Sequence, residues 1–111
     1  MIIKNARDVV PVPMHGGTCI VRRVLEVEEA KSRAFRFVDF DIVQPGIAIE
    51  PHAHPYEEIY IIVKGRGAMR VGGEEKDVNQ DDLIYIPPNE VHSLANTSKT
   101  PINLIVVAAV T

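Results

Sequence analysis

The chain has 111 residues, of which 46% are hydrophobic and 24% charged, as is ordinary for a single soluble globular domain. Its 12 Lys and Arg residues against 15 Asp and Glu give a net charge of −3. Without a basic cluster we expect neither a nucleic-acid nor a membrane partner. The 15 valines and 13 isoleucines against 4 leucines favour an all-β fold and argue against a helical bundle.

Residues 1–17 are interpreted as an N-terminal arm ahead of a single domain that spans 18–111. Proline and glycine separate the strand-like pair Ile2–Ile3 from the next strand, so the arm is available to pair with a second subunit, and we expect a homodimer. His15 is expected in a loop. The start of the chain lacks a signal-peptide pattern, and the single cysteine, Cys19, cannot form an internal disulfide. We therefore expect a cytoplasmic protein in which Cys19 is a small core residue.

Short β-patterned runs then follow one another every eight to twelve residues or so, a spacing typical of a sandwich or barrel. The expected strands are Thr18–Leu25, Ala34–Val43, Ile47–Glu50, Glu57–Val63, Ala68–Val71, Glu74–Val78, Asp82–Ile86, Val91–Asn96 and Ile102–Ala109. One helical turn is expected at Glu28–Arg33. Gly72-Gly73 fits a two-residue hairpin loop, because both positions tolerate positive φ. The run Ile59–Val63 is apolar at both parities, which predicts a strand covered on both faces, by the barrel interior and by a second sheet or subunit.

A pair of histidines and a glutamate form the first candidate site. Residues two apart on a strand point the same way, so His52 and His54 share a face, and Glu58 has the same parity. Glu57 has the opposite parity and is expected to point away. Two imidazoles and one carboxylate that converge from one segment are suitable ligands for a divalent metal.

A third imidazole, that of His92, is expected to join them if Asp82–Ile86 and Val91–Asn96 form a hairpin that returns beside the first segment. Burying an ionised glutamate beside three imidazoles without a cation would cost several kcal/mol of desolvation. A bound divalent ion removes this cost, because it favours the ionised carboxylate and the neutral imidazoles.

The spacing of these residues resembles the cupins. Gly46, His52, His54, Glu58 and Gly65 stand at the defined positions of the first cupin motif. The resemblance implies a double-stranded β-helix, or jelly-roll barrel, with the metal held by His52, His54, Glu58 and His92. It is closest to small single-domain cupins, which commonly dimerise.

The second cupin motif is matched at Pro87, His92 and Asn96, with two departures. Asp81 replaces the opening glycine, and Asn89 replaces the glycine after the proline. Asp and Asn are the non-glycine residues that best tolerate left-handed backbone, so both turns are expected to form.

Four protein ligands leave two adjacent positions open on an octahedral ion, so a small molecule with two oxygens, or with one oxygen plus dioxygen, fits there. We expect one divalent ion per chain, Mn²⁺ or Fe²⁺ before Zn²⁺, Ni²⁺ or Cu²⁺. Two functions fit best: a dioxygenase-type oxidoreductase or isomerase of small polar substrates, or a non-catalytic sensor or carrier that uses the metal to dock a metabolite. A structural metal is the third. Glu58 is also a candidate proton shuttle.

Four more polar residues lie near the motifs, where each could line the pocket or have a structural role. Tyr60 shares the parity of Glu58 and is a candidate for the substrate pocket, with core packing as the alternative. Arg36, Asp39 and Asp41 precede the first motif and are expected on the solvated surface. An additional polar group in the pocket would favour an enzyme over a binding module.

Overall fold

The computed structural model of the protein describes residues 1–14 and 19–111, so His15 and the predicted strand start at Thr18 lie outside the described residues. Strands dominate it. In chain order the elements are η1 Ala6–Asp8, β1 Val12–Met14, β2 Cys19–Glu26, α1 Val27–Ala30, β3 Phe35–Val43, β4 Ala48–His52, β5 Glu58–Lys64, β6 Gly67–Val71, β7 Glu74–Val78, β8 Leu83–Ile86, β9 His92–Ala95 and β10 Ile102–Ala109. Each predicted strand is present within a few residues, and the predicted helical turn is the short α1.

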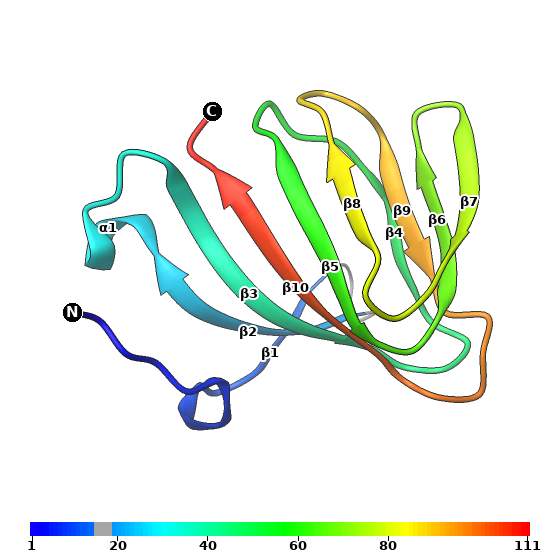
Figure 1. Ribbon diagram of the computed structural model, residues 1–111, viewed down its shortest axis with the longest axis horizontal. Coiled ribbons are helices and arrows are strands. Elements are labelled where there is room, and N and C mark those ends of the chain that lie inside the picture. Colours follow the sequence, from blue (N-terminus) through cyan, green and yellow to red (C-terminus); the bar gives the residue numbers. More distant parts are fainter. Residues whose placement is uncertain (15–18) are drawn as a thin grey trace.

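Two antiparallel sheets face each other (Figure 1). The larger has the order β1-β2-β3-β10-β5-β8, and the smaller has the order β4-β9-β6-β7. Consecutive strands β4 and β5 lie in different sheets, as do β8 and β9, so the chain crosses repeatedly between the two walls. This is the double-stranded β-helix that the sequence predicts.

The core lies between the sheets and is built by alternation along each strand. On β10 the side chains of Ile102, Leu104, Val106 and Ala108 are buried, and their neighbours are more exposed. The stiff β-branched side chains pack well on a pleated surface, which explains their excess over leucine. Cys19 is 1% exposed and a free thiol, in agreement with its predicted place in the core.

Part of the N-terminal arm joins the larger sheet, and one predicted hairpin is not formed. Within the arm, Val12–Met14 forms β1 and pairs with β2 of the same chain. The predicted hairpin of β8 with β9 is wrong, because β8 pairs with β5 while β9 pairs with β4 and β6. Tyr85 and Ile86 at the end of β8 pair with β5, and the Pro87-Pro88 turn then leads the chain to the opposite sheet.

The turns of the second motif form without glycine. Asp81 has φ +73° and Asn89 has φ +66°, so both adopt the predicted left-handed backbone. Asn96 then joins the two motifs: its backbone N–H donates to Ile47 O, and its own carbonyl accepts from the N–H of Gly46. The buried Asn96 side chain also donates to the carbonyls of Val43 and Thr100. These bonds hold the end of β9 beside the start of β4.

Candidate metal centre

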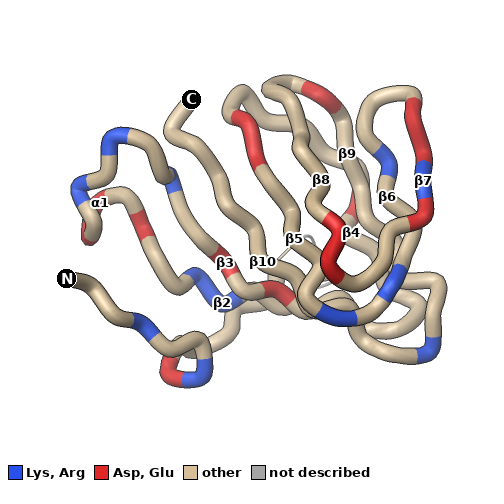
Figure 2. Tube along the Cα trace, viewed as in Figure 1, with Lys and Arg blue, Asp and Glu red and all other residues tan. Residues whose placement is uncertain are grey.

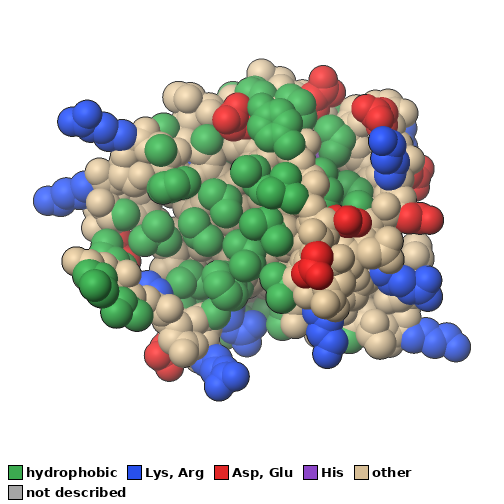
Figure 3. Space-filling view, in the orientation of Figure 1, with side chains coloured by type: hydrophobic (Ala, Val, Ile, Leu, Met, Phe, Trp, Pro, Cys, Tyr) green, Lys and Arg blue, Asp and Glu red, His purple; other side chains and the backbone are tan. Residues whose placement is uncertain are grey.

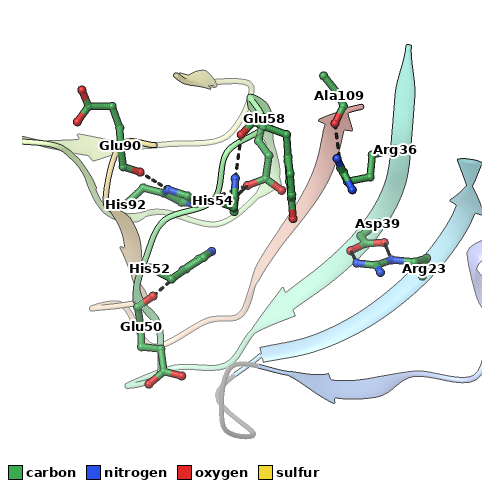
Figure 4. Close-up of polar contacts among 11 residues, drawn as sticks. Arg23, Arg36, Asp39, Glu50, His52, His54, Glu58, Glu90, His92 and Ala109 are labelled. Atoms are coloured by element: carbon green, nitrogen blue, oxygen red, sulfur yellow. Dashed lines mark hydrogen bonds and ion pairs between the residues drawn. The ribbon is translucent and has the colours of Figure 1, made fainter. Parts of the chain in front are cut away.

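The three predicted histidines meet between the sheets, each from a different element (Figure 4). His52 ends β4 and His92 begins β9, and the two are direct cross-strand partners with ring centroids 4.3 Å apart. His54 lies in the connection between β4 and β5, and Glu58 begins β5 in the other sheet. The sequence predicts this convergence, but the segment 53–57 is not a strand, so strand parity does not account for the inward placement of His54.

The ligand atoms of His52, His54 and His92 all lie within 4.8 Å of one another, which places them around a common point. The side chain of His92 is fully buried, whereas those of His52 and His54 are partly exposed. The group is therefore closed on the protein side and open toward the cavity.

Backbone carbonyls fix the tautomer of each imidazole. The Nδ1 atoms of His52 and His92 donate to the carbonyls of Glu50 and Glu90, at 2.8 and 2.9 Å. The Nδ1 atom of His54 donates to Tyr56 O at 2.8 Å. A carbonyl oxygen only accepts hydrogen bonds, so Nδ1 carries the proton and the lone pair of a neutral ring is on Nε2. This orientation by outer partners is a typical feature of metal-ligating histidines.

Glu58 brings a negative charge to these lone pairs. Its Oε1 lies 2.8 Å from His54 Nε2 and 3.5 Å from His92 Nε2, and its side chain is 5% exposed. His92 Nε2 is buried and has no hydrogen-bond partner among the described residues. A carboxylate oxygen facing imidazole lone pairs needs a proton or a metal ion between them. The residues present therefore fit a divalent cation held by mixed nitrogen and oxygen ligands.

Glu57 points away from the centre, as predicted. Its Oε2 accepts a hydrogen bond from the hydroxyl of the exposed Tyr85 at 3.0 Å. Neighbouring carboxylates on this segment thus have separate environments, one buried at the histidines and the other outside them.

A stack of three side chains supports His54. The Tyr56 ring lies parallel to the His54 ring with centroids 4.0 Å apart, and the Arg36 guanidinium covers the other side of Tyr56 at 4.2 Å. Arg36 also donates to the carbonyls of Ala109 and Val110 at the end of β10. Arg36 is half-buried rather than a solvated surface residue, and nothing in the sequence spacing predicted this stack.

A cavity of about 120 Å³ adjoins the centre and continues between the sheets. It is lined by Met14, Val21, Arg23, Phe37, Asp39, Asp41, His52, His54, Tyr56, Glu58, Tyr60 and Val106. Asp39 and Asp41 are 3% and 5% exposed, so their predicted place on the solvated surface is wrong. Both point inward from β3, where they alternate with outward-facing apolar residues.

The two aspartates have different partners. Asp39 receives two hydrogen bonds from Arg23, at 2.9 and 3.0 Å. One oxygen of Asp41, Oδ1, is buried with no hydrogen-bond partner among the described residues. Burial raises the pKa of Asp41 to about 8, with the nearby charge of Asp39 as the second cause. Burial also raises the pKa of the Cys19 thiol, to about 12, which fits an inert core thiol.

The raised pKa of Asp41 predicts that stability falls with pH. The folded state keeps a proton on Asp41 that the unfolded chain loses above its ordinary pKa of 3.8, so the free energy of unfolding declines until the pH passes about 8. The free energy of unfolding of wild type, measured relative to that of Asp41→Asn, is expected to fall by about 2 kcal/mol between about pH 5 and pH 7. Urea denaturation in the presence of a chelator measures this difference, and parallel pH profiles for the two proteins would contradict it.

Tyr60 lies beneath the centre. It is 2% exposed, its ring meets that of His92 edge-on with centroids 6.0 Å apart, and burial raises its pKa well above the ordinary value. Tyr60 thus packs in the core and also lines the cavity. Its contact with a substrate stays a prediction.

The sequence is similar to a known protein family and to curated proteins. A family model for the cupin domain matches residues 40–108. An uncharacterized protein of Methanocaldococcus jannaschii is 38% identical over 65 residues, which are 58% of this chain and 52% of that protein. Gentisate 1,2-dioxygenase of Haloferax sp is 35% identical over 43 residues, 39% of this chain and 12% of the enzyme. This chain therefore spans about half of the first relative's length and far less of the second's.

Solved structures show the same fold over the whole chain. A predicted oxalate decarboxylase of Thermotoga maritima superposes with a TM-score of 0.89 at 23% identity, covering 99% of this chain and 100% of that one. The polyketide cyclase RemF of Streptomyces resistomycificus gives a TM-score of 0.83 at 21% identity, covering 100% and 80%. At such identities the likeness establishes the architecture.

Proposed function

Because the chain belongs to the cupin family, we propose that it is a metal-dependent enzyme that acts on a small polar substrate, as a dioxygenase-type oxidoreductase or an isomerase. His52, His54, Glu58 and His92 hold one divalent ion, with Mn²⁺ or Fe²⁺ preferred by the mixed nitrogen and oxygen ligands and Zn²⁺, Ni²⁺ or Cu²⁺ as alternatives. The observation that carries the proposal is the convergence of three Nε2 atoms and one carboxylate at a cavity with further polar groups. Similarity to a dioxygenase and to the fold of a predicted decarboxylase supports it.

The residues of the centre have separable roles in this proposal. The bound ion supplies Lewis-acid or redox chemistry to oxygens of the substrate. Backbone carbonyls orient the three imidazoles through Nδ1, so that their Nε2 atoms would hold the ion. Glu58 accepts or returns a proton of the substrate, because a carboxylate leaves a metal ion more readily than an imidazole does and Glu58 lines the cavity. The buried rings of Tyr60 and Phe37 keep water from the inner part of the cavity.

The test reconstitutes the metal-depleted protein with Fe²⁺ or Mn²⁺ and follows dioxygen consumption and product formation with a panel of small diketones, hydroxy acids, thiols and catechols. Turnover that is lost in His92→Ala and kept in Glu57→Gln would support the enzyme. Ligand binding without turnover across the panel would instead assign the second function, a sensor or carrier of a small metabolite.

We propose a second copy of the chain as the protein partner. Over β3, β10, β5 and β8, the outer face of the larger sheet carries two cross-strand rows of uncharged residues: Phe40, Ile105, Ile61 and Leu83, and Val38, Val107, Ile59 and Tyr85. Arg22 of β2 borders the first row beside Phe40. Figure 3 shows this hydrophobic face, and Figure 2 shows that charges are sparse along β10 at its centre. The smaller sheet covers the inner face only, which leaves the predicted outer cover of Ile59–Val63 to a second subunit. An uncharged apolar face is complementary to itself, as a two-fold dimer requires.

The dimer is tested by light scattering after size-exclusion chromatography. We expect the wild-type protein to elute as a dimer and Ile105→Lys as a monomer, because burying an unpaired lysine in the interface costs several kcal/mol. Val91→Lys, at an exposed valine outside the larger sheet, is the matched control and should remain dimeric. A wild-type monomer at micromolar concentration would contradict the proposal.

A further inference from the structure

The cavity has a second polar wall, which belongs to the sheet opposite His52 and His92. His52 and His92 come from the smaller sheet, whereas Asp39 and Asp41 come from β3 of the larger sheet. All but His92 line the same space. A ligand that reaches the open side of the metal centre therefore also approaches the carboxyl groups of β3.

Of the two aspartates on this wall, only Asp39 has hydrogen bonds from the described part of the protein to both of its carboxyl oxygens. Both oxygens of Asp39 accept hydrogen bonds from Arg23, whose guanidinium also lies 3.9 Å above the centre of the Phe37 ring. Asp41 is 5% exposed, and its Oδ1 has no partner among the described residues. A buried carboxyl oxygen without a hydrogen bond costs free energy, and native structures seldom retain one without a use.

We propose that Asp41 is a specificity-determining residue, which accepts a hydrogen bond from a hydroxyl group of a small hydroxylated ligand whose other end binds at the metal centre. The inference rests on the proposed metal function and adds the ligand class to it. A monocarboxylate or ketone that carries a hydroxyl several bonds away has the required chemistry.

Charge and size both restrict the ligand. Glu58 and Asp39 already bring carboxyl groups to the cavity, and a second carboxylate on the ligand would face their charge at low dielectric. The cavity volume of about 120 Å³ corresponds to roughly four water molecules. We therefore expect a compact hydroxylated molecule to be preferred over a dicarboxylate of the same size.

The experiment is isothermal titration of the Mn²⁺-loaded protein with three probes of equal carbon chain length. Glycerate carries the terminal hydroxyl, lactate lacks it, and malonate has a carboxylate at that carbon and no 2-hydroxyl. Because the probes differ in their intrinsic strength as chelators, the measured quantity is the ratio of dissociation constants for each protein. Asp41→Asn and Asp41→Leu are compared with Asp77→Asn, which changes an exposed aspartate on β7.

For wild type we expect glycerate to bind about tenfold more tightly than lactate, the effect of one hydrogen bond to a charged or buried acceptor. Asp41→Leu should abolish this preference. Asp41→Asn, whose amide oxygen still accepts a hydrogen bond from a hydroxyl, should keep the preference for glycerate. Asp77→Asn should retain the wild-type ratios.

The outcomes separate the two proposals. If Mn²⁺ itself fails to bind stoichiometrically, the proposed metal function falls and this inference falls with it. If Mn²⁺ binds but wild type accepts glycerate and lactate equally, only the role of Asp41 is overturned. The lactate comparison needs no variant, so it can overturn the role of Asp41 even if the Asp41 variants fail to fold. Loss of the preference in Asp41→Leu separates the effect of Asp41 from the intrinsic chelating strength of the probes.

Discussion

Replacing His52 and His92 together with alanine is expected to reduce the bound metal from stoichiometric to below about a tenth of an equivalent after expression in defined medium. The two rings are cross-strand partners 4.3 Å apart, and the ligand atoms of both lie within 4.8 Å of that of His54. Their removal leaves one imidazole and one carboxylate, too few to compete for a divalent ion with a chelating medium. Elemental analysis of the purified proteins measures the difference, and stoichiometric metal in the double variant would contradict the site.

A matched pair of glutamates controls for charge. Glu58→Gln should weaken metal binding, because the Oε1 that faces the imidazoles loses its charge. Glu57→Gln removes the same charge one residue away, where the carboxylate accepts a hydrogen bond from Tyr85 outside the centre, and should leave metal binding unchanged. Equal effects of the two substitutions would mean that only the overall charge of the segment matters.

Metal removal should also lower the stability of wild type. An ion present at about a thousand times its dissociation constant stabilises the folded state by about 4 kcal/mol. A chelator is therefore expected to lower the melting temperature of wild type by about 15 °C and to leave that of the double histidine variant unchanged. This measurement reports the site without any assay of activity.

The strands and most of the metal centre follow from local patterns in the sequence. Alternation and turn residues fix the strand positions, and the left-handed turns at Asp81 and Asn89 follow from residue type alone. The spacing of the histidines identifies them as metal ligands, and this inference does not depend on knowing which strands pair. The backbone carbonyls that orient the rings, such as Glu50 O, carry no side-chain signal and are visible only in the fold.

The inward-facing carboxyl groups of β3 show why the second polar wall of the cavity could not be predicted from the sequence. Along Phe35–Val43 both parities contain apolar residues, so alternation does not say which face is inside. Phe40 lies on the outer apolar face while Asp39 and Asp41 are buried. Long-range pairing of β3 with β2 and β10 decides which face of β3 lies inside. This pairing places Arg23 beside Asp39, and it turns Asp41 toward the cavity. No local property of the segment reports these partners.

The substitution Gly65→Ala is expected to cost about 4 kcal/mol of unfolding free energy, a large share of the total for a domain of this size. Gly65 has φ +96°, which disfavours any side chain. A Cβ atom there would also lie 2.6 Å from the carbonyl oxygen of Pro101 and 3.0 Å from Ile102 Cα. Both neighbours are backbone atoms at the start of β10, so the clash is relieved only by moving a strand. Urea denaturation measures the loss.

Two other glycines separate these causes. Gly46 has φ +76° with nothing within 4 Å of an added Cβ, so Gly46→Ala should cost only the backbone strain, about 1 kcal/mol. Gly67 has no positive φ, but its Cβ would meet Ala95 O and lie 2.8 Å from Ile102 Cδ1, so Gly67→Ala should cost the clash, about 2 to 3 kcal/mol. The two motif glycines, Gly46 and Gly65, thus serve different needs. Equal losses in Gly46→Ala and Gly65→Ala would show that β10 yields to a methyl group and that φ alone requires glycine at both.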